Sequence, residues 1–271
     1  SGVPGMPGAI GEINDPGTFV TNDESSEQEP SLIQRANEDL VIVYNKGGQD
    51  NNLASSISSD YGKTWTEYTD IENGWDDISL IEVDDELVLL AILDGISTTS
   101  SNDGMNWGGI ADVTPTVSND AVGSIYFDGE YYYATYDHKI EELNTDVFVT
   151  RSNDLESWSD PIQITSEPGF NFDSSMTRVD GEYIIAAVSY NQGAIVYSTS
   201  TDGVNWSKTS IAMNVNVHAH GGLKVIDVDG TATMFYTSQG RLQYSELNNG
   251  VWSEPETLMK GLSFGADPIN L

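Results

Sequence analysis

A short turn that recurs along the whole chain constrains the fold more than any other feature. Residues 200–206 read STDGVNW, and close copies stand at 58–65 (SSDYGKTW), 101–107 (SNDGMNW) and 152–158 (SNDLESW). A weaker copy at 245–252 (SELNNGVW) lacks the aspartate. Successive tryptophans are 42, 51, 48 and 46 residues apart, counted over Trp65, Trp107, Trp158, Trp206 and Trp252. A period of roughly 40–50 residues is typical of one four-stranded propeller blade.

Each residue type in this turn has a mechanical role. Serine and aspartate side chains accept hydrogen bonds from the backbone of the turn, and glycine supplies a position with positive φ. The tryptophan that follows places a large apolar surface where two neighbouring sheets can bury it. The repeat therefore predicts one Ser-x-Asp turn and one packing tryptophan in each blade.

The residues between the turns read as strands. Apolar and aromatic runs such as AVGSIYF (121–127), EYYYATY (130–136) and DVFVTRS (146–152) are separated by turn residues, with Asp-Gly as a strong hairpin signal. No stretch has convincing helical periodicity. Five complete units predict an all-β fold, a five-bladed β-propeller with four antiparallel strands per blade. A six-bladed ring with one incomplete blade is the alternative, because residues 9–23 resemble an outer strand pair and Asp267 in ADPINL resembles a sixth blade start.

Composition narrows the class of partner. The chain has 271 residues, no cysteine, and 43 acidic against 10 basic residues, for a net charge of −33. Without cysteine there is neither a disulfide nor thiol chemistry, and no apolar run is long enough for a membrane helix. The sequence lacks the patch of basic residues that binds phosphates, which argues against nucleic acid as a partner. Acids spread over every loop favour a protein adapted to high salt, with an ordinary acidic extracellular protein as the alternative. We expect the protein to be extracellular or on a cell or virion surface.

The N-terminus differs from the rest. Residues 1–13 read SGVPGMPGAIGEI, with glycine at every third position (Gly2, Gly5, Gly8, Gly11) and two prolines. Gly-X-Y with proline is the collagen composition, because only glycine fits the axis of three wound chains. We therefore divide the chain into a collagen-like or linker segment at 1–17 and a propeller at 18–271. A collagen shaft would carry the propeller as a homotrimer.

Acidic residues recur at the expected blade starts. Glu29, Asp77, Asp120, Asp173 and His220 each stand just before an innermost strand in the predicted arrangement. They line a central channel in one interpretation and merely cap strands or bind water in the other. Clustered carboxylates would suit a hard cation, with calcium the best match and Asp77 and His220 as its ligands.

A second group of residues predicts ligand binding near the same end. Trp75 is the one tryptophan outside the repeated turns, and it precedes Asp76 and Asp77. It would offer a stacking surface for a sugar, or else pack between blades. His218 and His220 in NVHAHGG are either ligand-binding residues or ordinary loop histidines.

These turns resemble the Asp-box of sialidases, and SNDLESW is similar to the Ser-x-Asp-Leu-x-x-Trp of arabinanase- and xylosidase-type five-bladed glycoside hydrolases. Strand pairs such as FDGEYYYATY (127–136) are similar to theirs as well, and the resemblance covers residues 29–258. It implies a catalytic base at Glu29, an orienting carboxylate at Asp120, a general acid at Asp173, and His220 as the support of a central water or calcium ion.

The chain departs from that family at two of the three carboxylates. The family has aspartate where Glu29 stands and glutamate where Asp173 stands, and an inverting pair needs a matched separation of roughly 6.5–9.5 Å. The three-arginine carboxylate clamp of sialidases is not expected either, because the four arginines are predicted within strands or at their ends: Arg35, Arg151, Arg178 and Arg241.

The altered carboxylates and the Gly-X-Y segment favour a binding function. The sequence predicts an extracellular propeller head that recognises a glycan or a glycosylated cell-surface protein, such as the receptor-binding domain of a viral or surface fibre, without glycosidase activity. A glycoside hydrolase of the arabinanase or xylosidase type is the first alternative. A structural propeller is the second.

Overall fold

A computed structural model describes residues 20, 27–46, 52–73, 75–93, 95–114, 120–215 and 222–260. Within these ranges the side chains of 27–29, 72–73, 75–77 and 259–260 are not described. The predicted N-terminal segment 1–17 and the predicted sixth blade start at Asp267 lie outside the described residues.

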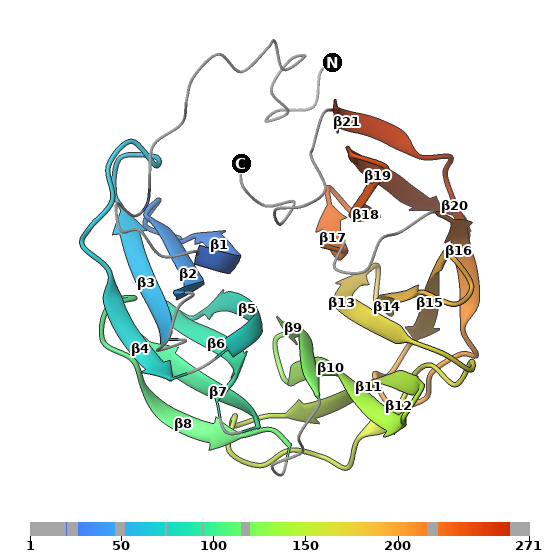
Figure 1. The fold of residues 1–271 in the computed structure, drawn as a ribbon, viewed down its shortest axis with the longest axis horizontal. Coiled ribbons are helices and arrows are strands. Elements are labelled where there is room, and N and C mark those ends of the chain that lie inside the picture. The colour runs from blue at the N-terminus through green and yellow to red at the C-terminus, as the bar shows by residue number, and fades with distance from the viewer. Residues whose placement is uncertain are drawn as a thin grey trace.

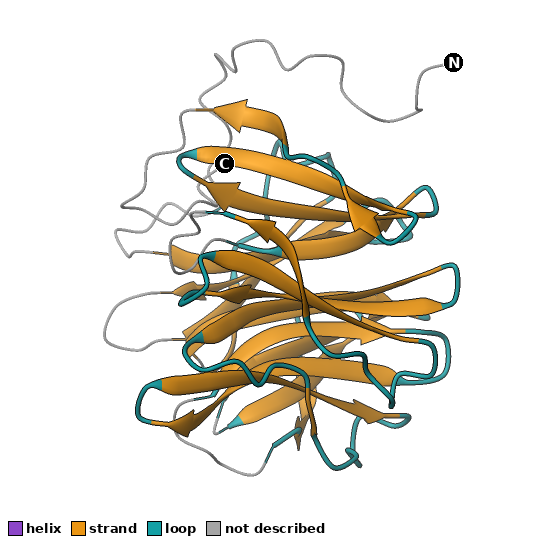
Figure 2. Ribbon diagram, turned by 90° about the vertical axis from the view of Figure 1, so that its right-hand side faces the viewer, coloured by secondary structure: helices purple, strands orange, loops and turns teal. Residues whose placement is uncertain are grey.

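The described chain forms five blades arranged as a ring, as the sequence predicted (Figure 1). Each blade is a sheet of antiparallel strands, numbered outward from the centre of the ring, and every regular element of the described residues is a strand (Figure 2). Among the described residues there is no helix that could span a membrane. The innermost strands β1, β5, β9, β13 and β17 surround the centre, and neighbouring innermost strands contact one another from β1 through to β17 (Figure 1).

Within each blade the chain runs from the innermost strand, called a, outward through strands b and c to strand d, and in the first four blades the Ser-x-Asp turn joins c to d. The first two blades hold β1 (Glu27–Gln34), β2 (Leu40–Lys46), β3 (Asn52–Ser58), β4 (Thr69–Asn73), β5 (Trp75–Val83), β6 (Glu86–Ile92), β7 (Ile96–Ser101) and β8 (Gly108–Asp112). The third and fourth hold β9 (Ala121–Phe127), β10 (Tyr132–Glu141), β11 (Asn144–Ser152), β12 (Ile162–Gln163), β13 (Asn171–Val179), β14 (Glu182–Ser189), β15 (Ala194–Ser200) and β16 (Ser210–Asn214). The fifth holds β17 (Lys224–Val228), β18 (Thr231–Ser238), β19 (Arg241–Asn248), β20 (Val251–Trp252) and β21 (Glu256–Lys260).

The Ser-x-Asp turns work as predicted. In the fourth blade Ser200 Oγ accepts the N–H of Gly203 at 2.9 Å, and Asp202 Oδ1 accepts the N–H groups of Val204 and Asn205 at 2.9 and 2.7 Å. Equivalent bonds close the turns that begin at residues 58, 101 and 152. The turn is thus a self-contained unit that reverses the chain between strands c and d.

The fifth turn is not a member of this series. Ser245 Oγ donates to the carbonyl of Ser253 at 2.8 Å, which is the bond that Ser198 makes with the carbonyl of Ser207 at 2.7 Å. Ser245 therefore corresponds to Ser198, two residues before the turn serine, and the turn position is occupied by Leu247. The interpretation of residues 245–252 as a degenerate copy of the turn is wrong in its register.

The core lies between the blades. Four clusters of buried apolar residues fill the four interfaces between successive blades, and one turn tryptophan packs at each of them: Trp107, Trp158, Trp206 and Trp252. Trp252 is buried and the others are half-buried. Each tryptophan covers the interface between its own blade and the preceding one, as expected of residues that bury apolar area between sheets.

Successive innermost strands are also joined by a repeated hydrogen bond. A serine on one strand accepts the backbone N–H of the next strand, at distances of 3.0–3.2 Å: Ser31 from Leu80, Ser79 from Ile125, Ser124 from Met176, and Ser175 from Val225. We call Ser31, Ser79, Ser124 and Ser175 the inter-blade serines. Their equal register places the starts of all five innermost strands at one end of the ring, called the strand-start end below.

Candidate functional site

A β-bulge interrupts the innermost strand of each of the first four blades just before its inter-blade serine. The pairing register shifts between Gln28 and Ser31, between Trp75 and Ser79, at Gly123, and between Phe172 and Ser175. A bulge bends the strand and turns a side chain away from the regular alternation. Glu29, Asp77 and Asp173 each lie inside such a bulge, two residues before the serine.

The strand register corrects the prediction that an acidic residue stands just before each innermost strand. Glu29, Asp76, Asp77 and Asp173 lie within their strands and not before them. Asp120 does precede its strand, but it stands four residues before Ser124, so its equivalent in the fourth blade is Asn171 and not Asp173. The β9 position equivalent to Asp173 is Val122, next to the bulge at Gly123, where a Cβ would lie 2.8 Å from the carbonyl oxygen of Ser174 on β13.

Asp120 forms the best-defined polar pair at the strand-start end. Its Oδ1 lies 2.6 Å from Nδ1 of His138, which comes from the far end of β10. The Asp120 side chain is 4% exposed and that of His138 is 32% exposed. The second carboxylate oxygen of Asp120 is buried without a hydrogen-bond partner among the described residues.

Burial is the main influence on the pKa of the Asp120 carboxyl. Desolvation raises the pKa of Asp120 above its ordinary value, and the hydrogen bond and charge of His138 act against that rise. The ring of Phe148 meets His138 edge-on at a centroid distance of 5.7 Å. An imidazole held by a carboxylate in this way is an arrangement suited to proton transfer or to orienting a bound group.

A structural carboxylate fixes the neighbouring strand. Asp146 is buried and accepts hydrogen bonds from Thr165, Gln163 and Asn171 at 3.0, 2.9 and 3.1 Å. Burial raises the pKa of Asp146, and these hydrogen bonds oppose the rise. Because Asn171 begins β13, this anchor sets the position of Asp173 two residues later.

Asp173 adopts an unusual backbone conformation. Its φ is 52°, in the left-handed region, and its side chain is half-buried. Aspartate tolerates this region better than most residues, and such positions often cluster at functional sites. The bulge and the positive φ together single out Asp173 on its strand.

The remaining predicted site residues are only partly placed. The backbones of Glu29, Trp75, Asp76 and Asp77 lie on β1 and β5 at the strand-start end, but their side chains are not described, and His218 and His220 lie outside the described residues. Among the side chains that are described, no three of His, Asp or Glu gather as a metal site would require. The predicted cation ligands Asp77 and His220 therefore stay a prediction.

His138 was not predicted. In the sequence it follows the apolar run of 130–136, where a strand-end histidine carries no motif. The one available signal was its place opposite the start of β9, which becomes visible only once the pairing of Asp137 with Ala121 is known.

Comparison with known proteins identifies the fold. No protein-family model matches the chain, and no curated protein is similar to it in sequence. Solved structures do match: an α-L-arabinanase of Penicillium chrysogenum complexed with arabinobiose has a TM-score of 0.67 at 16% identity, over 89% of this chain and 86% of the arabinanase. An α-L-arabinofuranosidase of Fusarium graminearum matches with a TM-score of 0.65 at 13% identity, over 88% of this chain and 83% of the enzyme.

A sialidase of Streptococcus pneumoniae matches with a TM-score of 0.66 at 13% identity, and the chain spans 62% of its length. Identities this low establish a shared architecture and not a shared activity. The chain is thus a five-bladed β-propeller that is structurally similar to arabinanases, arabinofuranosidases and sialidases.

Proposed function

We propose that the protein hydrolyses glycosidic bonds at the strand-start end of its ring, with arabinose-containing glycans as the first substrate class to test. The observation that carries the proposal is the Asp120–His138 pair: a buried carboxylate holds a half-exposed imidazole at the end where three further acids lie in strand bulges. The sequence favoured a binding head. The similar solved structures are mainly glycoside hydrolases, which supports the hydrolase alternative instead.

The roles follow from what glycoside hydrolysis requires. One carboxylic acid protonates the leaving oxygen while a second carboxylate activates water or attacks the sugar. We assign the acid to Asp173 and the base to Glu29, as the resemblance implies. His138, oriented by Asp120, positions the substrate or relays a proton. No step is assigned to a metal ion.

Activity assays on matched variants test this proposal. The wild type is screened with chromogenic arabinosides, xylosides and sialosides and with arabinan. Asp173→Asn and Glu29→Gln should each lower kcat by roughly 100-fold or more, the loss expected when a general acid or base is removed. His138→Gln should shift the pH profile of kcat/KM.

Asp180→Asn is the matched control. Asp180 has a φ of 50°, close to that of Asp173, and lies in the turn directly after the same strand. Asparagine tolerates that conformation. Its variant should keep wild-type activity. Hydrolysis that persists in both Asp173→Asn and Glu29→Gln would refute the assignment, and the absence of turnover on every substrate would refute the hydrolase proposal.

A binding head without hydrolysis is the second candidate. One observation favours it: Glu29 and Asp173 have the opposite side-chain lengths to those of the resembled hydrolases. A shift of about 1 Å at a reacting group can cost roughly 100-fold in rate. This candidate predicts glycan binding without turnover, and binding that is weakened in Trp75→Ala.

A further inference from the structure

A cavity opens at the end of the ring opposite the candidate site, between the third and fourth blades. Its volume is about 390 Å³. It lies beside the turn that joins β9 to β10 and beside the Ser-x-Asp turn of the fourth blade. Its side chains are mostly charged or phenolic: Asp128, Glu130, Tyr131, Tyr133, Arg151, Arg178, Tyr183 and Asp202.

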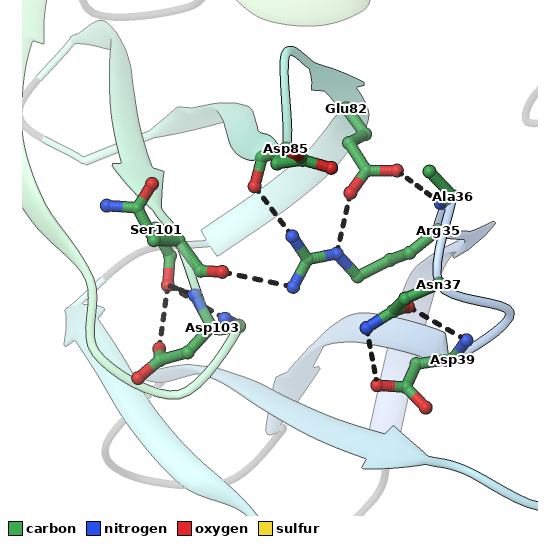
Figure 3. A network of polar contacts seen from close by, with 10 residues as sticks. Arg35, Ala36, Asn37, Asp39, Glu82, Asp85, Ser101 and Asp103 are labelled. Atoms are coloured by element: carbon green, nitrogen blue, oxygen red, sulfur yellow. Dashed lines mark hydrogen bonds and ion pairs between the residues drawn. The ribbon is translucent and has the colours of Figure 1, made fainter.

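The equivalent place between the first and second blades is closed by an ion pair (Figure 3). Arg35 Nε donates to Glu82 at 2.7 Å, and the other guanidinium nitrogens donate to the carbonyls of Asp85 and Asn102 at 2.6 and 3.1 Å. The Arg35 and Glu82 side chains are 9% and 14% exposed. Each of the three nitrogens of this guanidinium thus donates to a group of the protein.

The strand register shows which residues correspond at the two interfaces. Arg178 pairs with Tyr183 across neighbouring strands, and Glu82 pairs with Leu87. Tyr183 and Leu87 each pair in turn with the first serine of a Ser-x-Asp turn, so Arg178 corresponds to Glu82. By the same register, Asp128 corresponds to Arg35, and Tyr133 and Arg151 correspond to Val41 and Ile57. At the interface between the third and fourth blades the acid and the arginine have therefore changed places. Tyrosine and arginine stand there where the interface between the first and second blades has valine and isoleucine.

The exchanged charges do not form the corresponding ion pair. Asp128 accepts the hydroxyl of Tyr183, and its other oxygen accepts the N–H groups of Glu130 and Tyr131 at 2.8 Å each. Burial would raise the pKa of Asp128, but these hydrogen bonds outweigh it and lower the pKa. Asp202 is likewise saturated by donors of its own turn.

Both arginines keep their donors available. The Arg178 guanidinium lies over the ring of Tyr183 at 4.7 Å, and that of Arg151 lies over Tyr131 at 4.6 Å. Among the described side chains neither arginine forms an ion pair, and Nε of Arg178 is buried without a hydrogen-bond partner. Stacking on tyrosine fixes a guanidinium plane while leaving its edge free for a planar anion.

We propose that this cavity is a second binding site, which takes a carboxylate-bearing sugar such as a uronic acid residue. Arg151 and Arg178 hold the carboxylate, since the guanidinium fork matches its geometry. Glu130 accepts hydrogen bonds from sugar hydroxyls. Three acids in the lining would repel a simple anion, so the mixture of charges suits a ligand that carries both a carboxylate and hydroxyls. The site stands independently of catalysis at the strand-start end.

The first test compares ligands on the wild-type protein. Isothermal titration at fixed ionic strength uses galacturonic acid, its methyl ester, galactose and acetate. Galacturonate should bind. Its methyl ester and galactose should bind at least about tenfold more weakly, the loss expected when a hydrogen-bonded charge is removed. Acetate keeps the charge but lacks the sugar hydroxyls, and it should also bind more weakly than galacturonate. Equal affinity for galacturonate and its ester would overturn the proposal, as would equal affinity for acetate or no binding of galacturonate at all.

The second test locates the site. Arg178→Gln and Arg151→Gln should each weaken galacturonate binding by roughly 10- to 100-fold. Arg178→Lys, which keeps the charge and loses the fork, should fall between them and the wild type. Arg241→Gln, an exposed arginine of β19, is the matched control and should bind as the wild type does. Asp173→Asn should also bind normally, which separates this site from the proposed catalytic one.

Unchanged affinity in Arg178→Gln and Arg151→Gln would overturn the assignment of the cavity. Circular dichroism verifies that each variant is folded. If Arg178→Gln fails to fold, Arg178→Lys and the ester comparison still decide the matter, because neither removes the charge that the interface contains.

Discussion

Arg35 is the single residue whose removal should damage this fold most clearly. Its side chain is 9% exposed, and its guanidinium makes three hydrogen bonds that cross from the first blade to the second (Figure 3). Arg35→Gln leaves the Glu82 carboxylate buried without a counter-charge. Removing one partner of a buried ion pair costs about 3–5 kcal/mol. We expect a loss near the lower end of that range in urea unfolding.

The double variant Arg35→Met/Glu82→Leu is the informative comparison. Replacing both charges with apolar groups of similar size removes the desolvation cost together with the attraction, so its stability should lie close to that of the wild type. Arg241→Gln should change the free energy of unfolding by no more than about 0.5 kcal/mol. A double variant as unstable as Arg35→Gln would mean that the lost packing, and not the unpaired charge, sets the cost.

Individual residues were the least predictable level of this protein. The four arginines look alike in the sequence, yet Arg35 closes one interface while Arg151 and Arg178 line a cavity at another. The environment of each arginine depends on which residue of the neighbouring blade lies next to it. The strand register determines that residue. For the same reason the sequence missed His138 and misaligned Asp120 with Asp173.

Among the elements, the Ser-x-Asp turns should make stability depend on pH. Hydrogen bonds from the side chain and backbone of Thr64 lower the pKa of Asp60 to about 2. The pKa values of the corresponding aspartates in three other turns are lowered as well. A folded pKa below the unfolded value of about 3.9 gives stability that is present above pH 4 and is lost as the pH falls through 2.

We therefore expect the unfolding midpoint of the wild type to fall steeply below about pH 4. Asp202→Asn removes one of these carboxylates and keeps the side chain's size. It should be less stable than the wild type at pH 7, and the difference should shrink towards zero near pH 2. Urea unfolding at several pH values measures this. A difference that is constant with pH would show that the turn does not depend on the charge of its aspartate.

The inter-blade serines are the second element-scale prediction. Ser79 is buried and accepts the N–H of Ile125 at 3.1 Å. Ser79→Ala would leave that N–H unsatisfied, at a cost of about 1–3 kcal/mol. Ser100→Ala, on β7 of the same blade, is the control and should be nearly neutral. Equal stability of the two variants in urea would show that water replaces the serine.

The elements were also the level at which the sequence was most informative. The turn period and the strand–turn–strand pattern predicted five blades of four antiparallel strands, which is confirmed. These signals are local, since each turn is closed by its own side chains. The inter-blade serines join strands about 50 residues apart, and serine is too common for such a pattern to be noticed in one sequence.

At the scale of the whole molecule the dominant property is the net charge of −33. Mutual repulsion of like charges acts against the compact state, because unfolding moves the charges apart. Salt shortens the range of this repulsion, from a Debye length of about 30 Å at 0.01 M to about 3 Å at 1 M. We therefore expect the melting temperature to rise with sodium chloride concentration, most steeply at low ionic strength.

A partly neutralised variant separates this effect from general salt effects on proteins. It replaces five exposed glutamates by glutamine, for a net charge of −33 + 5 = −28: Glu141, Glu142, Glu156, Glu182 and Glu254. The variant should melt at a higher temperature than the wild type in low salt, and its melting temperature should rise less with salt, because less repulsion is left to screen. Thermal unfolding of both proteins between 0.01 and 1 M sodium chloride, values chosen to span those Debye lengths, measures the two slopes. Parallel slopes would assign the salt response to stronger apolar burial, which salts also promote. A melting temperature that is flat or falling in the wild type would instead remove the case for adaptation to high salt.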